Sequence, residues 1–285
     1  MTATTTTLPR ERPGTWARFG RNQLAVAGGL ILAAVALLAL AAPLLPLPDP
    51  NATDLPNRLA RMFSAGHLLG ADHLGRDMLS RIVWGTRVSL AVGAAAALAA
   101  ALVGSLIGIV AGFYGRWVDT VLMRLVDVLL AIPGILLSLS IIIVTGFGSL
   151  QAAFAVGMTS VATFARLARS QVIQIAGADY VEAAYGSGAT QAQVLLRHVL
   201  PNSLTPVLAL AALQFGTAIL QLSILGFLGY GAPPPVPEWG LLIAEGRDYM
   251  ATAWWLILLP GLAIVATVMS ANHLSQVIQQ EGDVK

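Results

Sequence analysis

The chain has 285 residues, of which 56% are hydrophobic and 11% charged, and its formal net charge is +2. Soluble domains carry about 25% charged residues, so this sequence has too few charges to cover a soluble globule of its size, and the small net charge gives no reason to expect a nucleic-acid partner. The absence of cysteine excludes disulfides and thiol chemistry.

Six segments are long and apolar enough to cross a membrane, which requires about 20 mostly apolar residues. We predict spanning helices at residues 24–47, 88–113, 125–145, 149–168, 204–228 and 251–271. The first segment exceeds the apolar core of a signal peptide, about 7–15 residues, and is therefore expected to be retained. The predicted fold class is all-α, a polytopic membrane protein with six transmembrane helices.

The distribution of arginine and lysine favours a cytoplasmic N-terminus. With that orientation the cytoplasmic segments carry ten basic residues and the outer segments six. Residues 1–21 are then an expected disordered cytoplasmic tail, 22–272 the transmembrane domain and 273–285 a cytoplasmic C-terminal tail. Within the domain, 48–87 is the main outer segment and 169–203 a cytoplasmic segment. The expected location is a plasma membrane, crossed several times, with both termini cytoplasmic.

Two features of the predicted helices indicate packing. Gly104, Gly108 and Gly112 are spaced four apart, and small residues at this spacing let two helix backbones approach closely in lipid. Arg124 and Asp127 are three apart at the cytoplasmic end of the third predicted helix, so we predict that they form a structural ion pair.

Several chemistries are excluded or disfavoured by what the sequence lacks. A P-loop needs a lysine before Ser or Thr to hold nucleotide phosphates, and the one lysine here is the last residue, Lys285. The centres of the predicted helices carry no series of Asp, Glu or His, which a proton-coupled carrier requires. The four histidines lie near or outside the predicted spans, which disfavours a membrane-embedded enzyme. We therefore expect a non-catalytic chain with no cofactor and no metal of its own.

A polar stretch, DYVEAAYGSGATQAQVLLRHVLPN at 179–202, separates the fourth and fifth predicted spans. Its EAA triplet favours a helix, two glycines end that helix, and Thr190 with Gln193 fits a capping box that starts a second helix. We expect the second helix to end near Leu200, because proline cannot continue it at Pro201. Its predicted apolar face consists of Ala192, Leu195, Leu196 and Val199. This helix has few basic residues for a lipid-surface helix, so a groove in a partner protein fits better.

This stretch resembles the EAA signature of bacterial ABC-importer permeases. Four further segments resemble the dipeptide, oligopeptide and nickel permease family, and more closely its second, C-type permease: HLLGADHLGRDMLSRIVWGTRVSL at 67–90, GFYGRWVDTVLMRLVDVLLAIP at 112–133, ILGFLGYGAPPPVPEWG at 224–240 and AEGRDYM at 244–250. The resemblance covers about residues 20–270.

The resemblance implies a type I ABC importer permease fold and a coupling role for the polar stretch. Its coupling residues would be Glu182, Ala183, Ala184, Gly188, Arg197 and Pro201. Implied partners are a homologous second permease, two ATPase subunits that bind ATP and Mg²⁺, an extracytoplasmic solute-binding protein and membrane lipid. Small peptides are the implied cargo, with nickel, another metal complex or a glycoside as alternatives; a self-contained secondary carrier or channel is a remote one.

Departures from the family pattern occur at Tyr185, Ser187 and Leu222. The family commonly has Arg and Leu at the first two positions and an acidic residue near the third, so a substrate contact cannot be carried over to Leu222.

Two outer features have alternative interpretations. His67, Asp72, His73 and Asp77 are residue types that bind zinc or nickel, but Asp77 and Arg81 fit an i,i+4 ion pair, and we favour a structural role. The proline-rich run APPPVPEWG at 232–240 is expected to be either a stiff loop or part of the surface that docks the solute-binding protein.

Overall fold

The computed structural model describes residues 23–64 and 66–282, and in these ranges the chain is helical with no β-strand. The helices are α2 Gln23–Ala41, α3 Met78–Tyr114, α4 Arg116–Ala131, α5 Gly134–Thr145, α6 Ser149–Ala176, α7 Asp179–Gly186, α8 Gln191–Val194, α9 Leu200–Phe227, α10 Trp239–Gly246 and α11 Trp255–Gly282. Short turns η1 Ala42–Leu44, η2 Leu55–Asn57 and η4 Arg247–Tyr249 and a π-helical segment η3 Leu195–Val199 complete the list.

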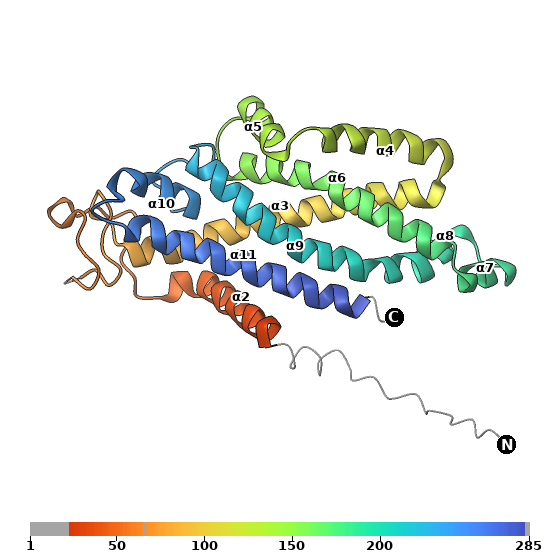
Figure 1. Ribbon diagram of the computed structural model, residues 1–285, viewed down its shortest axis with the longest axis horizontal. Coiled ribbons are helices and arrows are strands. Elements are labelled where there is room, and N and C mark those ends of the chain that lie inside the picture. Colours follow the sequence, from red (N-terminus) through yellow and green to blue (C-terminus); the bar gives the residue numbers. More distant parts are fainter. Residues whose placement is uncertain (1–22, 65, 283–285) are drawn as a thin grey trace, which may run out of the picture.

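The long helices lie side by side in an elongated bundle (Figure 1). At one end, called here the α7–α8 end, α7 and α8 protrude on the same side as the start of α2 and the end of α11. At the other, the α10 end, lie the loops of residues 45–77 and α10. The loops of residues 45–77 and the polar stretch at 179–202 therefore lie at opposite ends of the bundle.

Within the described residues, five single helices are long and apolar enough to cross a membrane: Val26–Leu44, Met78–Tyr114, Ser149–Ala176, Gln191–Phe227 and Trp255–Gln279. The third predicted span, 125–145, is not one helix. It divides into α4 and α5, which meet at an angle of 94°. Proline disfavours helical backbone at the residue before it, and Ile132, preceding Pro133, is extended at φ −93° and ψ 128°.

The predicted helix end near Leu200 is also wrong, because the chain stays helical from Gln191 to Phe227. Pro201 stands in the first turn of α9, directly after the π-helical residues Leu195–Val199. A wider π turn removes the usual i→i−4 pairing at this point, so the missing N–H of proline and its ring are tolerated.

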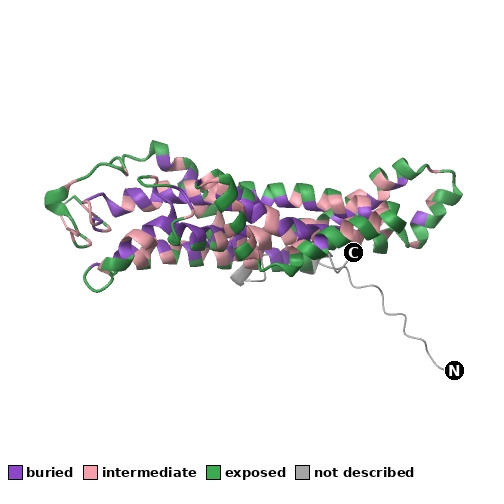
Figure 2. Ribbon diagram, turned by 90° about the horizontal axis from the view of Figure 1, so that it is seen from above, coloured by how far each residue is buried: buried purple, intermediate pink, exposed green. Residues whose placement is uncertain are grey.

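The centre of the bundle is the crossing of α3 and α6. A Cβ on Gly104 or Gly108 would overlap the backbone carbonyl oxygens of Val161 and Ala165, and one on Gly112 would lie 2.9 Å from the carbonyl oxygen of Arg169. The glycines therefore allow direct contact of the two backbones. Figure 2 shows buried residues along the middle of the bundle and into the α10 end, whereas the α7–α8 end is largely exposed.

The chain ends were predicted to be tails. The N-terminal prediction, residues 1–21, lies outside the described residues. At the C-terminus, residues 273–282 continue α11 as helix, so they do not form a separate irregular segment.

Candidate functional site

The polar stretch forms the protruding helix–turn–helix of the α7–α8 end. Helix α7 ends at Gly186, and Gly188 adopts φ +89°, a left-handed conformation that glycine adopts without steric cost. No atom lies within 4 Å of a Cβ built on Gly188. The turn therefore requires glycine for its backbone conformation and not for space.

The predicted capping box is confirmed at the start of α8. The Thr190 hydroxyl accepts a hydrogen bond from the Gln193 backbone N–H at 3.3 Å, and the Thr190 backbone N–H donates to Gln193 Oε1 at 2.8 Å. These two bonds satisfy backbone donors that a helix start leaves open. They fix the direction in which the chain leaves the glycine turn.

The apolar face of the second helix differs from the predicted one. Val194 and Val199 are buried and pack with Val172 of α6 and Val181 of α7. Leu196, predicted to share this face, is 63% exposed. The π-helical turn changes the helical period over these residues, so the buried face belongs to the chain's own core and does not remain free for a groove.

The predicted coupling residues lie on the exposed surface of this segment. Glu182, Ala183, Gly188, Arg197 and Pro201 are exposed and Ala184 is partly so. Three exposed apolar side chains accompany them: Tyr185, Leu196 and Tyr180, of which the sequence analysis did not single out Tyr180. A surface that combines the carboxylates of Asp179 and Glu182, the guanidinium of Arg197 and several apolar groups fits the composition of a docking surface for a protein.

Two ion pairs connect α4 to α6 near this end. Asp127 accepts a hydrogen bond from Arg166 Nη2 at 2.8 Å, so the predicted Arg124–Asp127 pair is wrong: the structure pairs Asp127 with an arginine 39 residues away. Asp119 accepts from both Nε and Nη2 of Arg169, the latter at 2.6 Å. Helical spacing would allow Asp127 to pair with an arginine of α4 itself, but in the packed bundle both aspartates pair with arginines of α6.

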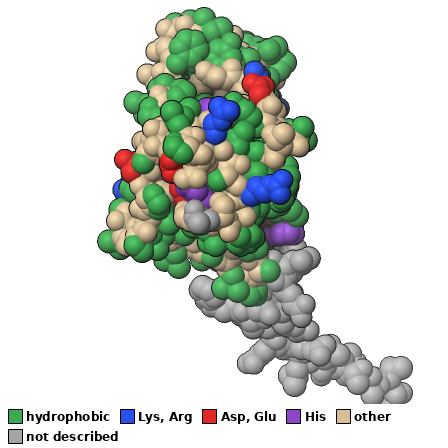
Figure 3. Space-filling view, turned by 90° about the vertical axis from the view of Figure 1, so that its left-hand side faces the viewer, with side chains coloured by type: hydrophobic (Ala, Val, Ile, Leu, Met, Phe, Trp, Pro, Cys, Tyr) green, Lys and Arg blue, Asp and Glu red, His purple; other side chains and the backbone are tan. Residues whose placement is uncertain are grey.

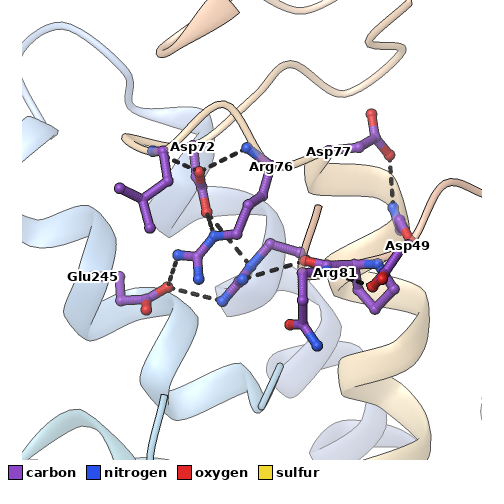
Figure 4. Close-up of polar contacts among 10 residues, drawn as sticks. Asp49, Asp72, Arg76, Asp77, Arg81 and Glu245 are labelled. Atoms are coloured by element: carbon purple, nitrogen blue, oxygen red, sulfur yellow. Dashed lines mark hydrogen bonds and ion pairs between the residues drawn. The ribbon is translucent and has the colours of Figure 1, made fainter. Parts of the chain in front are cut away.

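The α10 end contains a buried ion network (Figure 4). Asp72 accepts from Arg76 Nε at 2.6 Å, and Glu245 of α10 accepts from Arg76 Nη2 and from Arg81 Nη2, both at 2.9 Å. The side chain of Arg81 is fully buried and that of Arg76 3% exposed. The network ties the outer segment to the first turn of α3 and to α10.

The predicted Asp77–Arg81 pair is therefore wrong. Asp77 caps α3 by accepting from the Ser80 backbone N–H at 2.8 Å, and it lies 3.1 Å from His67 Nδ1. No group of three or more metal-binding side chains occurs in the described ranges. The acidic residues of this segment are engaged in capping and ion pairing, in line with the structural interpretation.

The proline-rich loop combines an exposed rim with a buried base. Pro233, Pro234 and Pro235 are exposed, whereas Glu238 is 3% exposed and accepts a hydrogen bond from the Ala232 backbone N–H at 2.8 Å. Burial raises the pKa of Glu238 above its usual range, although the bond from Ala232 opposes this. Around the loop, the α10 end presents hydrophobic surface with scattered charged groups (Figure 3), and its exposed apolar residues are Leu55, Phe63, Leu68, Met250 and Trp254.

Two family descriptions match the sequence. Residues 104–280 match the binding-protein-dependent transport system inner membrane component, and residues 14–62 match the N-terminal transmembrane domain of oligopeptide transport permease C.

Curated relatives are similar over nearly their whole length. The dipeptide transport system permease protein DppC of Alkalihalophilus pseudofirmus is 39% identical over 265 residues, covering 93% of this chain and 87% of the relative. The glutathione transport system permease protein GsiD of Pectobacterium atrosepticum is 39% identical over 271 residues, with 95% and 90% covered. The di/tripeptide transport system permease protein DppC of Pseudomonas aeruginosa is 36% identical over 275 residues, with 95% and 91% covered.

Among solved structures, the inward-facing MetNI methionine ABC transporter matches with a TM-score of 0.55 at 20% identity. The match covers 73% of this chain and 95% of that one. It identifies the fold as that of a type I ABC importer permease.

Proposed function

Because the chain belongs to the family of binding-protein-dependent transport system inner membrane components, we propose that it forms half of the translocation path of an ATP-driven importer of small peptides. The peptide cargo is supported by the relatives named for dipeptide, di/tripeptide and glutathione transport. The observation that carries the coupling role is the exposed α7–α8 surface with Glu182 and the left-handed Gly188.

The proposed orientation places the α7–α8 end and both termini in the cytoplasm of a bacterium and the α10 end outside its inner membrane. The basic-residue bias supports this orientation. It puts the exposed helix–turn–helix where ATPase subunits are found, and the proline-rich loop where a solute-binding protein would arrive.

The proposed partners are a homologous second permease and two ATPase subunits that hold ATP and Mg²⁺. This chain contributes no nucleotide site, since Lys285 is its one lysine and a P-loop needs one before Ser or Thr. It would catalyse no covalent step. Its part is to transmit a conformational change between the motor and the cargo path.

The coupling surface would act as a rigid handle. Tyr180, Tyr185 and Leu196 offer apolar contact area, and Glu182 and Arg197 add charge complementarity. The opposite face of the segment, formed by Val181, Val194 and Val199, packs on Val172 of α6. A partner that moves this surface therefore moves α6 and α9, which line the interior of the bundle.

At the opposite end, the solute-binding protein would dock on the prolines of the loop and the exposed apolar residues around them. The buried base of the loop fixes the position of the exposed prolines. Glu238 accepts a hydrogen bond from the Ala232 backbone N–H, and the Trp239 backbone N–H donates to the Ser89 hydroxyl of α3 at 3.2 Å. Docking there would reach α3 directly.

The coupling role is tested with Glu182→Lys and Gly188→Val in the complete importer reconstituted in liposomes. Charge reversal removes the complementary contact, and valine strains the turn because its Cβ disfavours a positive φ. Both variants should insert and purify with the sister permease, while peptide uptake and the stimulation of ATPase activity by loaded binding protein fall severely.

Gln191→Ala is the control, because Gln191 is exposed on the same segment without a role in the capping box; its uptake should stay near the wild-type rate. If both test variants assemble and import peptide like the wild type, the segment does not couple the motor to transport. ATP hydrolysis by the purified chain alone would contradict the assignment of the motor to partner subunits.

A further inference from the structure

Helix α6 has two chemically opposite faces. Val161, Ala165 and Ala168 face the glycines of α3. On the other side Thr159, Thr163, Arg166 and Ser170 recur at spacings of four, three and four, which places them on one face of the helix. At a rise of about 1.5 Å per residue this polar row is about 16 Å long, roughly half the hydrocarbon thickness of a bilayer.

The polar row borders a groove. An open cavity of about 400 Å³ lies between α6, α4 and α9, and its lining residues are Leu130, Thr163, Arg166, Leu167, Ser170 and Leu210. Asp127 of α4 bonds Arg166, so the charge of the guanidinium at this groove is compensated. The groove therefore presents hydroxyl groups and a neutralised ion pair between apolar walls.

Beyond the groove, in the direction of the α10 end, the polar surface continues. A Cβ on Gly134, in the first turn of α5, would lie 3.8 Å from Gln221 Nε2 of α9 and from Thr159 Cβ. Ser138 follows one helical turn later on the same face of α5. Helices α5, α6 and α9 thus bring amide and hydroxyl side chains together near the break between α4 and α5.

Two of these groups are buried without a partner. Neither Ser138 Oγ nor Gln221 Oε1 makes a hydrogen bond within the described part of the chain, and Ser138 is 1% exposed. A buried polar atom left unpaired carries a desolvation cost that a hydrogen-bonding partner would offset. Polar side chains at membrane depth are costly when they face lipid. They usually face the interior of a helix bundle, a water-filled cavity or a substrate path.

We propose that the α6 polar row, together with Ser138 and Gln221, lines the cargo path and binds the main chain of the imported peptide. Hydroxyl and amide groups both donate and accept hydrogen bonds, as peptide groups do. They therefore do not discriminate among the side chains of the imported peptide. A path with compensated charge and single, separated hydrogen-bonding groups holds the cargo weakly enough to release it. This inference rests on the proposed peptide-import function.

The test uses single cysteines, because the chain has none of its own. Thr163→Cys is compared with Leu102→Cys, whose native side chain is 72% exposed on the apolar surface of α3, in the complete importer reconstituted in liposomes. A hydrophilic maleimide should label position 163 and not position 102. A library of dipeptides and tripeptides delivered by the binding protein should slow labelling of position 163 several-fold, whereas free amino acids should not.

Gln221→Leu adds a kinetic readout. It should raise the KM for peptide uptake about five-fold, as expected for one lost hydrogen bond, while assembly and the stimulation of ATPase activity by the binding protein persist. Loss of kcat with unchanged KM would overturn the binding role of Gln221.

The remaining outcomes separate this inference from the function on which it rests. If position 163 is labelled only when the sister permease is absent, the groove is a subunit interface and the inference is wrong. Labelling that peptide does not slow, in an importer that takes up peptide, also overturns it. A wild-type importer that takes up none of the library overturns the peptide cargo, and this inference falls with it.

Discussion

The two ends of the molecule are built from opposite kinds of contact. At the α10 end, buried charges from the outer segment, α3 and α10 form ion pairs, with Arg81 fully buried between Asp72 and Glu245. At the α7–α8 end, four buried valines anchor the helix–turn–helix and its charged groups point outward. At one end the charges are buried and paired within the chain, while at the other they are exposed.

This difference suits the roles that the proposed function gives to the two ends. A network of buried ions tolerates little displacement, because separating one partner leaves an uncompensated charge in a medium of low dielectric constant. A helix held by a small apolar patch keeps its shape but can move together with a partner protein bound to it. The α10 end is therefore expected to be a fixed platform and the α7–α8 end a handle.

The largest effect should come from breaking the ion network. Arg81→Met leaves the carboxylates of Asp72 and Glu245 with one guanidinium between them, and loss of one member of a buried pair costs about 3–5 kcal/mol. We expect a large fall in the thermal unfolding temperature of the detergent-solubilised chain. Arg247→Met is the matched control, because its pair with Asp248 is highly exposed, and it should unfold like the wild type. An Arg81→Met protein of wild-type stability would refute the interpretation of the α10 end as a fixed platform.

Two glycine substitutions, one at the crossing of α3 and α6 and one in the turn between α7 and α8, should have effects of intermediate size on stability. Alanine at Gly108 must push its Cβ against the backbone of Ala165, and overpacking of this kind costs about 1–3 kcal/mol. Alanine at Gly188 meets no atom within 4 Å and strains only its own φ of +89°. Gly108→Ala should lower the global unfolding temperature, whereas Gly188→Ala should raise the hydrogen-exchange rate of α7 and α8 alone. Equal losses of global stability would show that the handle is as integral to the fold as the crossing.

The smallest effect concerns pH. Because burial raises the pKa of Glu238, the folded state binds its proton more tightly than the unfolded state does. Stability should then fall as pH rises from the ordinary carboxyl pKa through the raised one, since ionisation becomes costly in the folded chain. Glu238→Gln should remove this part of the pH dependence and still accept from Ala232. The check is the difference in unfolding temperature between wild type and variant at acidic and neutral pH; a constant difference would contradict the prediction.

Much of the fold was readable from local pattern. Apolar runs placed the spanning helices, and Thr190 with Gln193 correctly predicted the start of α8, because capping involves residues three apart. The glycine series 104, 108 and 112 indicated a close helix crossing, and that crossing is formed with α6. The exposure of Glu182, Gly188 and Arg197 follows from the same polar pattern that drew attention to the segment.

The two wrong ion pairs have a common origin in contacts between distant segments. Helical spacing predicted that Asp127 pairs with Arg124, but its partner is Arg166, 39 residues away. It also predicted that Arg81 pairs with Asp77, but its partner is Glu245, 164 residues away. Proline at 201 suggested a helix end, and the preceding π-helical turn accommodated it within one long helix. Local rules state what each residue permits and leave open which neighbour the bundle provides.

The sequence by itself determined that this protein is a helical membrane protein with a capped helix–turn–helix, since these properties depend on composition and short-range hydrogen bonding. The tertiary structure decided how each charge is paired, that α4 and α5 meet at 94°, and which face of α6 is polar toward a groove. Those outcomes depend on the balance of burial and ion pairing among helices that are remote in sequence, and this balance exists only once the helices are packed.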